Sequence, residues 1–348
     1  MRRLRQMIIG ALCCMLIAGA VSWDARGETA AVLPQHIQLA EHAVIDAANL
    51  PLYEYSVTLR DFLSCAPEDF HAGKIKNTEH YESEYGTWDD IYFYTFTDGY
   101  SLTVSGTSLD FGNRHHDNYS QLLTYLDNEE SQAPEEEPFP LPEAQARCDR
   151  LIKQLDIGYL VPERTVPLSS GTIRQLTAEM KERLHGGKLD CFESFPEEIG
   201  AWYLTFRQMP GGIPVTDLTH TPQVRIVLTK DETALLEINS IIDTIDEAKM
   251  LPETTSPEDA LRYYMAEHPE VQRDDRQETF RISRIMQAYC ADIRGETLSL
   301  PVRERLCPCW RVESMQFIQI GSETLAVPLS ELYRIPGGEK VKPVIRGE

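Results

Sequence analysis

Short β-prone runs separated by turns that contain glycine or proline recur through most of this sequence. The clearest case is IYFYTF (91–96), which is followed by Asp98-Gly99 and then by YSLTVS (100–105). Glycine accepts the positive φ angle that a tight turn requires, so an Asp-Gly pair between two such runs predicts a β-hairpin. Hairpins of this kind predict antiparallel sheet and not a parallel, doubly wound one.

The second half of the sequence continues this pattern. WYLTF (202–206) is followed by a Pro-Gly-Gly turn and IPVTDL (213–218), and VRIVL (224–228) is followed by a charged turn and LLEINSI (235–241). We expect two successive hairpins that form a meander of four strands. Further strands are expected at 50–59, 106–111, 279–289, 309–320 and 324–327.

Apolar residues at helical spacing predict helices between these strands. One is expected at 142–155, with a proline in its first turn, and others at 118–126 and 172–184. A further helix is expected to begin after Ser256, which is a good N-cap, and Asp259 places a negative charge near the positive end of that helix.

Residues 127–140 (DNEESQAPEEEPFP) contain six acidic side chains and three prolines. Such a segment repels itself and cannot bury apolar area, so it predicts an extended linker. We therefore expect an α+β fold with two modules of antiparallel β-sheet, each with helices packed on one face. The expected order is an N-terminal α+β module at 28–126, the linker at 127–140, a C-terminal α+β module at 141–335 and a flexible tail at 336–348.

The N-terminus has the charge pattern of a secretory signal. Three arginines among the first five residues precede an apolar run at 7–21, which is shorter than the roughly 20 residues that a membrane-spanning helix needs. The small residues Ala18-Gly19-Ala20 suit cleavage, so residues 1–20 are predicted to be a signal peptide. The alternative is an uncleaved anchor. The predicted location is secreted or extracytoplasmic, in association with the cell envelope.

The chain is strongly acidic, with 33 Lys and Arg against 55 Asp and Glu and a formal net charge of −22. A field of that sign repels phosphate backbones, so nucleic acid is not expected as a partner. Solubility explains such acidity, and recognition of a basic partner is the alternative. We expect a protein or peptide partner, and contact with a membrane only if the signal is retained as an anchor.

Six cysteines follow the predicted signal, and an even number in an exported chain permits disulfides. Cys307 and Cys309 could form a redox pair or half of a metal site. A structural zinc site needs two further ligands, and a redox thiol needs a helix N-terminus, whereas this stretch leads into a predicted strand. We expect one of these thiols to form a disulfide with Cys290 on a neighbouring strand. Cys148 and Cys191 are a second candidate pair.

No sequence motif of a catalytic site is present. The chain lacks the serine nucleophile elbow, the Ser-x-x-Lys arrangement, the His-Glu-x-x-His helix, the P-loop and the Gly-x-Gly-x-x-Gly turn. His115 and His116 are adjacent, and neighbours on a strand face opposite sides, so a solvated loop is expected. A metal site there would require His220 or His71. No catalytic residue, cofactor or metal is therefore expected.

Large aromatic and arginine side chains are the remaining candidates for a functional surface. Trp202, Tyr203 and Trp310 lie in predicted strands together with Arg225 and Arg311. Aromatic and arginine side chains are favoured at binding interfaces, so these residues form a possible interaction surface. The alternative is that the aromatic residues belong to the core and the arginines are solvated.

The C-terminal part resembles a known kind of protein over roughly residues 141–330. In layout it is similar to uncharacterised lipoprotein-like proteins exported by Gram-positive gut bacteria, to PepSY-like modules and to extracytoplasmic regulators of the cell-wall sensor kinase. Here no lipid-accepting cysteine follows the signal, unlike in the lipoproteins. The residues that carry the resemblance are Gly212-Ile213-Pro214-Val215, Glu258, Ala260, Ile282, Ile285, Tyr289 and Trp310.

The resemblance implies that the chain binds or restrains other proteins and does not catalyse a reaction. The sequence therefore predicts a non-enzymatic extracytoplasmic binding or regulatory protein of unknown partner. The alternative is a secreted hydrolase or a small-ligand-binding protein with its site between the two modules.

Overall fold

The computed structural model describes residues 33–46, 50–82, 90–128, 136–183, 200–216, 221–252, 255–270, 276–291, 302–320 and 323–341. The predicted signal peptide at 1–20, Cys191 and residues 342–348 of the predicted tail lie outside these stretches. None of the helices within them has the length and apolar composition of a membrane-spanning helix.

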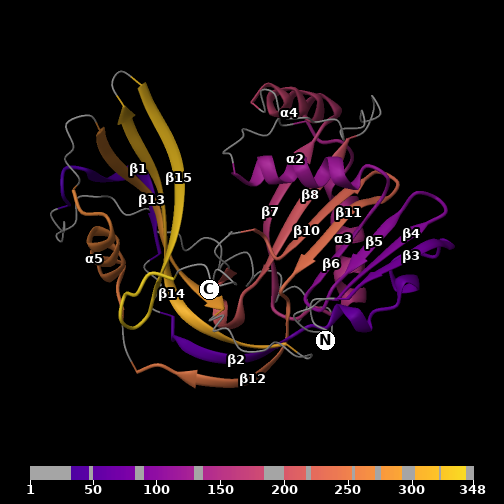
Figure 1. Ribbon diagram of the computed structural model, residues 1–348, viewed down its shortest axis with the longest axis horizontal. Coiled ribbons are helices and arrows are strands. Elements are labelled where there is room, and N and C mark those ends of the chain that lie inside the picture. The colour runs from indigo at the N-terminus through magenta and orange to yellow at the C-terminus, as the bar shows by residue number, and fades with distance from the viewer. Residues whose placement is uncertain are drawn as a thin grey trace, which may run out of the picture.

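The strands form two sheets, which occupy the two halves of the molecule in Figure 1. The eight-stranded sheet has the order β3-β4-β5-β6-β11-β10-β8-β7. Its hairpin between β4 and β5 turns at Gly99, where φ is 92°, which confirms the Asp-Gly prediction. The bounds are β3 Ile75–Tyr81, β4 Ile91–Phe96, β5 Ser101–Val104, β6 Ser108–Gly112, β7 Leu160–Leu168, β8 Ala201–Gln208, β10 Val224–Thr229 and β11 Thr233–Asn239.

The seven-stranded sheet has the order β1-β13-β14-β2-β12, with β15 added to β14 and β9 added to β13. The strands β1 and β9 pair with β13 in parallel, and the other pairings in the described part of the chain are antiparallel. The bounds are β1 Ile37–Ile45, β2 Tyr53–Leu59, β9 Val215–Thr216, β12 Ile242–Met250, β13 Arg276–Ala291, β14 Arg303–Ile320 and β15 Glu323–Arg334.

The expected meander of four strands is wrong in one element. Strand β8 pairs directly with β10, with Tyr203 opposite Val227, and β10 pairs with β11. The segment between them, β9, leaves this sheet and pairs with β13 of the other one, with Val215 opposite Tyr289. The Pro-Gly-Gly turn therefore carries the chain from one sheet to the other.

The eight-stranded sheet is inserted into the seven-stranded one. The chain leaves the seven-stranded sheet after β2 and returns at β12, where Ile242 pairs with Leu59. Each sheet thus takes strands from both sides of the acidic segment 127–140, and β6 and β7, which flank that segment, lie in the same sheet. The two sheets do not correspond to the consecutive segments 28–126 and 141–335.

Helices pack against both faces of the eight-stranded sheet, so the expected packing on one face is not confirmed here. Alternate residues of β8 belong to different cores. Trp202 packs with α3 residues on one face, and Tyr203 packs with α2 and α4 residues on the other. The helices are α2 His116–Asn128, α3 Leu141–Leu155, α4 Ser170–Arg183 and α5 Pro257–Glu267, with short 3-10 turns at Phe62–Ser64, Pro67–Asp69 and Pro210–Gly212.

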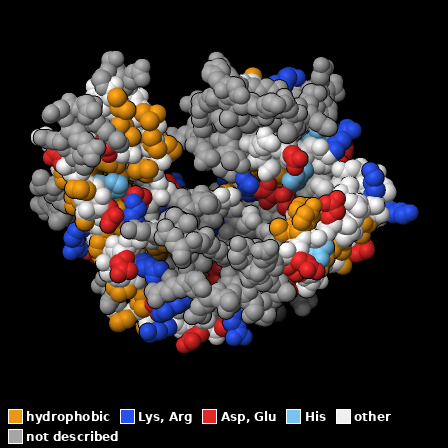
Figure 2. Space-filling view, in the orientation of Figure 1, with side chains coloured by type: hydrophobic (Ala, Val, Ile, Leu, Met, Phe, Trp, Pro, Cys, Tyr) orange, Lys and Arg blue, Asp and Glu red, His pale blue; other side chains and the backbone are white. Residues whose placement is uncertain are grey.

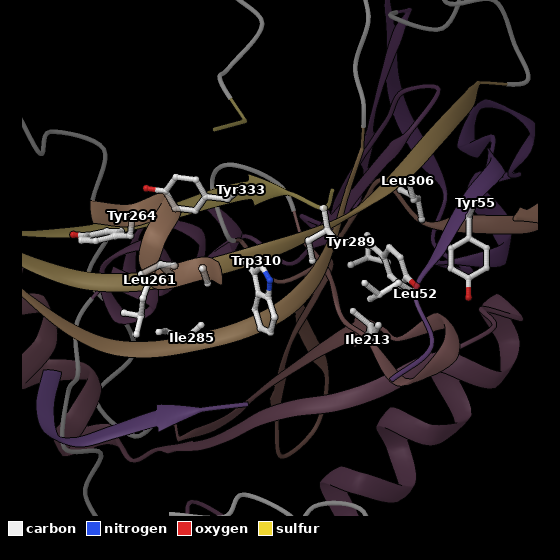
Figure 3. Packing of buried hydrophobic residues seen from close by; sticks show 14 of the residues in the cluster. Leu52, Tyr55, Ile213, Leu261, Tyr264, Ile285, Tyr289, Leu306, Trp310 and Tyr333 are labelled. Atoms are coloured by element: carbon white, nitrogen blue, oxygen red, sulfur yellow. The ribbon is translucent and has the colours of Figure 1, made fainter. Parts of the chain in front are cut away.

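Helix α5 covers the core of the seven-stranded sheet (Figure 3). It begins with the expected cap, because the Ser256 N–H donates to Asp259 Oδ2 at 2.9 Å. Its Tyr264 hydroxyl lies 2.7 Å from Ser314 Oγ of β14, and Trp310 Nε1 donates to Thr255 Oγ1 at 2.8 Å just before the helix. Figure 3 shows these aromatic side chains among the aliphatic residues of the same core.

Cys290 and Cys307 are directly opposite each other in the pairing of β13 with β14. Cys309, two residues along β14, packs with Cys290 in a small buried cluster. No disulfide joins the cysteines that the structure describes, so the predicted link to Cys290 is not confirmed. Cys148 is buried in α3, which raises its pKa to about 12, and its predicted partner Cys191 lies outside the described residues.

The carboxylate of Glu331 in β15 contacts both His268, which follows α5, and Lys340 near the C-terminus. It contacts Nε2 of His268 at 2.7 Å, accepts a hydrogen bond from the Tyr333 hydroxyl at 2.6 Å and pairs with Lys340. Burial alone would raise the pKa of Glu331, but these three partners outweigh it and hold the pKa at about 2.

Replacement of this carboxylate should change the acid stability of the protein. Because the folded pKa of Glu331 lies below its unfolded value, its contribution is complete above pH 4.5 and is lost as the pH falls towards 2. We expect Glu331→Gln to lower the free energy of unfolding at pH 7 and to flatten its decrease between pH 5 and 2. Urea unfolding followed by circular dichroism measures both. An unchanged acid slope in the variant would contradict this assignment.

Candidate functional site

One face of the eight-stranded sheet carries a row of polar side chains across consecutive strands. Asp110 of β6 is opposite Glu237 of β11, which is opposite Arg225 of β10. Thr103 of β5 and Thr205 of β8 extend the row on either side. Two residues further along the strands, the same face is apolar and packs under α2. The sheet face is therefore divided into a covered apolar part and a charged part.

Helix α2 adds His116 to this row. Its Nε2 atom is hydrogen-bonded to Asp110, and its Nδ1 atom lies 3.1 Å from Asp117 Oδ1. One ligand-type atom each from Asp110, His116 and Glu237 lies within 4.8 Å of the other two. No other trio of His, Cys, Asp or Glu side chains among the described residues meets this condition. On the face shown in Figure 2, acidic, basic and histidine side chains lie near one another over this half of the molecule.

The turn between β6 and α2 places His116 over the sheet. The Asn113 carbonyl accepts a hydrogen bond from the His116 N–H at 2.9 Å, and the Asn113 side chain accepts one from His115 N–H at 2.9 Å. Gly112 is required beneath the imidazole, because a Cβ atom there would lie 2.6 Å from His116 Cδ2. The close approach of ring and strand thus depends on a missing side chain.

Glu237 and Arg225 form a buried ion pair. Their exposed fractions are 5% and 8%, and Ser120 Oγ of α2 donates a hydrogen bond to Glu237 Oε1 at 2.7 Å. Two charges are costly to remove from water, and the pair persists because each compensates the other. The cluster therefore has one rigid, buried side at Glu237 and a more exposed side at Asp110.

The environment of His116 stabilises its protonated form. Burial acts to lower the pKa of the imidazole, but hydrogen bonds and charge from Asp110 and then Asp117 outweigh it and raise the pKa to about 9. The cluster thus binds one proton firmly at neutral pH.

A second group of charges lies where the two sheets meet. Arg207 of β8 donates from Nε to Glu163 Oε1 at 3.0 Å, and an Arg311 terminal nitrogen of β14 lies 2.7 Å from Glu313 Oε1. The pKa of Arg311 lies below its usual value because burial disfavours the charged form; Glu313 opposes this shift and the charge of Arg207 adds to it. Each of these arginines has an acidic neighbour, so the junction is balanced in charge.

The predicted aromatic and arginine surface is not assembled in this structure. Trp202, Tyr203 and Trp310 have exposed fractions of 3%, 0% and 1% and belong to three different cores. Arg225 belongs to the buried pair and Arg311 to the junction of the sheets. The aromatic residues therefore belong to the core, as the alternative held, but the arginines are not solvated, since Arg225 is 8% exposed and the Arg311 side chain 14%.

The histidine pair also differs from expectation. His116 begins α2 and contacts Asp110, so the predicted solvated loop is wrong for this residue. His71, proposed as a further ligand, lies elsewhere with its Nε2 atom 2.7 Å from Asp98 Oδ2, and His220 is outside the described residues. Sequence reasoning missed Asp110 and Glu237. One signal for Asp110 was present in the sequence: it lies six residues before His116, near the end of a predicted strand, so the following turn can bring the two side chains together.

No model of a known protein family matches this chain, and no curated protein matches it significantly. A crystal structure of an uncharacterized protein from Eubacterium rectale ATCC 33656, at 1.45 Å resolution, is similar, with a TM-score of 0.53 and 12% sequence identity. The match covers 90% of this chain and 92% of that one. The similarity shows a shared fold over almost the whole chain.

The buried ion pair predicts a large loss of stability when one partner is removed. Arg225→Met leaves the Glu237 carboxylate buried without its counter-charge, and we expect a loss of about 3–5 kcal/mol in the free energy of unfolding. The exposed pair of Arg305 with Glu54 gives the control, because Arg305→Met should cost about 0–1 kcal/mol. Urea titration measures both variants, and equal losses would be inconsistent with this description.

Proposed function

We propose that this protein is an exported, non-enzymatic binding or regulatory protein whose partner is a protein or peptide. The observation that carries the proposal is an apolar surface at the end of the ribbon formed by β13, β14 and β15. Ile320 and Leu325 have exposed fractions of 60% and 56%. Exposed apolar side chains of this size lose contact with water when a partner covers them, which favours association.

The ribbon extends well away from the centre of the molecule (Figure 1). Its strands have 16, 18 and 12 residues, and β14 is paired with β13 and β15 up to Ile320. We call Ile318, Ile320 and Leu325 the ribbon tip; Ile318 is opposite Leu325, and all three lie on one face of the ribbon. Hydrophobic side chains gather in the same part of the molecule in Figure 2. A long ribbon with an apolar end is suited to contact a partner.

The outer edge of β15 supports the same proposal. Over residues 323–329, no strand of the described chain pairs with this edge. Unpaired backbone groups at a sheet edge can accept an extended segment from another protein as an additional strand. Backbone pairing along β15 and burial of the ribbon tip would then act together.

The resemblance to exported lipoprotein-like, PepSY-like and kinase-regulator proteins points to the same kind of function, and we propose that family relationship on the layout described above. In this proposal the seven-stranded sheet, with α5 on one face, is the module that takes the partner. The N-terminal arginines and the apolar run that follows them support the proposal that the protein is exported.

Affinity capture from the native cell envelope tests this proposal. We expect the wild-type protein to recover one envelope protein reproducibly, and Leu325→Glu to reduce that recovery at least tenfold. Tyr81→Glu is the matched control, because Tyr81 is equally exposed at 56% but lies in β3 at the far edge of the other sheet. If Tyr81→Glu abolished recovery of the envelope protein and Leu325→Glu did not, the partner would bind the eight-stranded sheet and not the ribbon tip. Turnover of a polysaccharide or peptide by the purified protein would contradict the non-enzymatic function.

Export also bears on the cysteines, and we propose a disulfide between Cys290 and Cys307 in the exported protein. The described cysteines do not lie at disulfide distance in this structure, so the proposal depends on the positions of Cys290 and Cys307. They are directly opposite each other on antiparallel strands, where Cα atoms lie about 4.5–5.5 Å apart. Two thiols become one disulfide while a disulfide oxidant of the compartment is reduced to two thiols. Closure of this loop would stabilise the protein by about 3 kcal/mol.

Mass spectrometry of the unreduced, exported protein tests the disulfide. We expect a peptide cross-linked through Cys290 and Cys307, together with loss of about 3 kcal/mol of stability in Cys290→Ser. The buried Cys148 thiol should stay unmodified in the same sample. Alkylation of both Cys290 and Cys307 after unfolding without reductant would contradict the pairing.

A second candidate function is a small-ligand-binding protein or secreted hydrolase. The convergence of Asp110, His116 and Glu237 favours it, because two carboxylates and an imidazole in reach of one another can hold or polarise a ligand. This cluster lies on the eight-stranded sheet, far in the fold from the ribbon tip.

A further inference from the structure

We infer that Asp110, His116 and Glu237 form a binding site for a divalent transition-metal cation of the zinc class. The inference is independent of the proposed partner at the ribbon tip. An imidazole nitrogen and two carboxylate oxygens are a donor set that Zn²⁺ uses, and a harder ion such as Ca²⁺ prefers oxygen ligands alone.

The three ligand atoms are close enough for one ion. They lie within 4.8 Å of one another. An ion placed between them is therefore within about 3 Å of each, and small rotations of the side chains reach zinc–ligand distances of about 2.0–2.2 Å. The ligands come from β6, α2 and β11, and Asp110 and Glu237 are held opposite each other by strand pairing.

The second nitrogen of His116 supports this assignment. Histidines that bind metals through one ring nitrogen usually donate the other N–H to a carboxylate. His116 Nδ1 lies 3.1 Å from Asp117 Oδ1, while Nε2 faces Asp110. In the metal-free protein Nε2 donates to Asp110. When a metal ion displaces that proton, the proton held at Nδ1 leaves Nε2 with the lone pair that the ion requires.

The charges of the cluster also suit a divalent cation. The carboxylates of Asp110, Asp117 and Glu237 carry three negative charges, and Arg225 carries one positive charge. With a neutral imidazole as ligand, the cluster therefore has two negative charges, which a divalent cation balances.

Two further features show that the site is built around these side chains. Glu237 is 95% buried, its Oε2 atom is paired with Arg225, and its Oε1 atom accepts a hydrogen bond from Ser120 Oγ. These contacts hold the carboxylate in place opposite Asp110, as the carboxylate ligands of metal ions are usually held by further hydrogen bonds. Gly112 leaves the space that the imidazole occupies. The Asp110 side chain, 36% exposed, provides access from solvent.

Calorimetric titration of the metal-free full-length protein with Zn²⁺ tests the inference. We expect one site per chain, much weaker binding of Mg²⁺ and Ca²⁺, and a loss of at least about 100-fold in zinc affinity in His116→Ala. Asp117→Asn keeps all three ligands and should weaken binding about 10-fold through the orientation of the imidazole. Asp110→Asn is a second ligand variant at a more exposed position. Circular dichroism confirms that each variant is folded.

His71→Ala is the matched control, because His71 also pairs with an aspartate but no third ligand from the described part of the chain joins them. Its zinc affinity should equal that of the wild type. Absence of zinc binding to the wild-type protein would overturn the inference. Zinc affinity that is unchanged in His116→Ala would also overturn it. If Cys307→Ser then abolished zinc binding, the ion would be assigned to the cysteines of β13 and β14.

Discussion

The antiparallel pairing of β2 with β12 determines how this chain can form two sheets. The chain leaves the seven-stranded sheet at Leu59, forms the eight-stranded sheet, and returns to the first sheet at Ile242, which is paired with Leu59. Because the exit and the return are neighbours, the inserted sheet has both of its ends held at one place. The strand β9 adds a second link, since Val215 pairs with β13 within the excursion. The position of every residue of the eight-stranded sheet relative to the ribbon depends on these two pairings.

Local structure was predictable where local interactions specify it. The Asp98-Gly99 hairpin, the helix α3 and the capped start of α5 each depend on residues a few positions apart, and the structure confirms them. The strand β3 was missed because it is exposed and largely polar. The strand β1 was missed because its apolar residues do not alternate with polar ones. The acidic segment 127–140 has the composition of a linker, but composition does not reveal that β6 and β7 on either side of it join one sheet through β11, β10 and β8.

The candidate site was harder to predict for a related reason. Asp110 and His116 are close in sequence, but Glu237 reaches them only through the pairing of β6 with β11, across more than a hundred residues. Similarly, Trp202 and Tyr203 are neighbours on a strand and so face opposite sides, but the sequence does not reveal that helices cover both sides. Strand periodicity specifies which residues share a face, whereas the burial of that face depends on elements elsewhere in the chain.

The two proposed functional surfaces differ in what they require from the fold. The ribbon tip needs only long paired strands, and its residues Ile320 and Leu325 remain exposed because no described element covers them. The charged cluster needs a buried counter-charge at Arg225, a helix start at His116 and a glycine beneath the imidazole. Helix α2 serves both folding and this cluster, because its apolar residues cover the sheet while His116 and Ser120 complete the charged part of the same face. A change that shifts α2 would therefore disturb the core and the cluster together, while leaving the pairing of the ribbon intact.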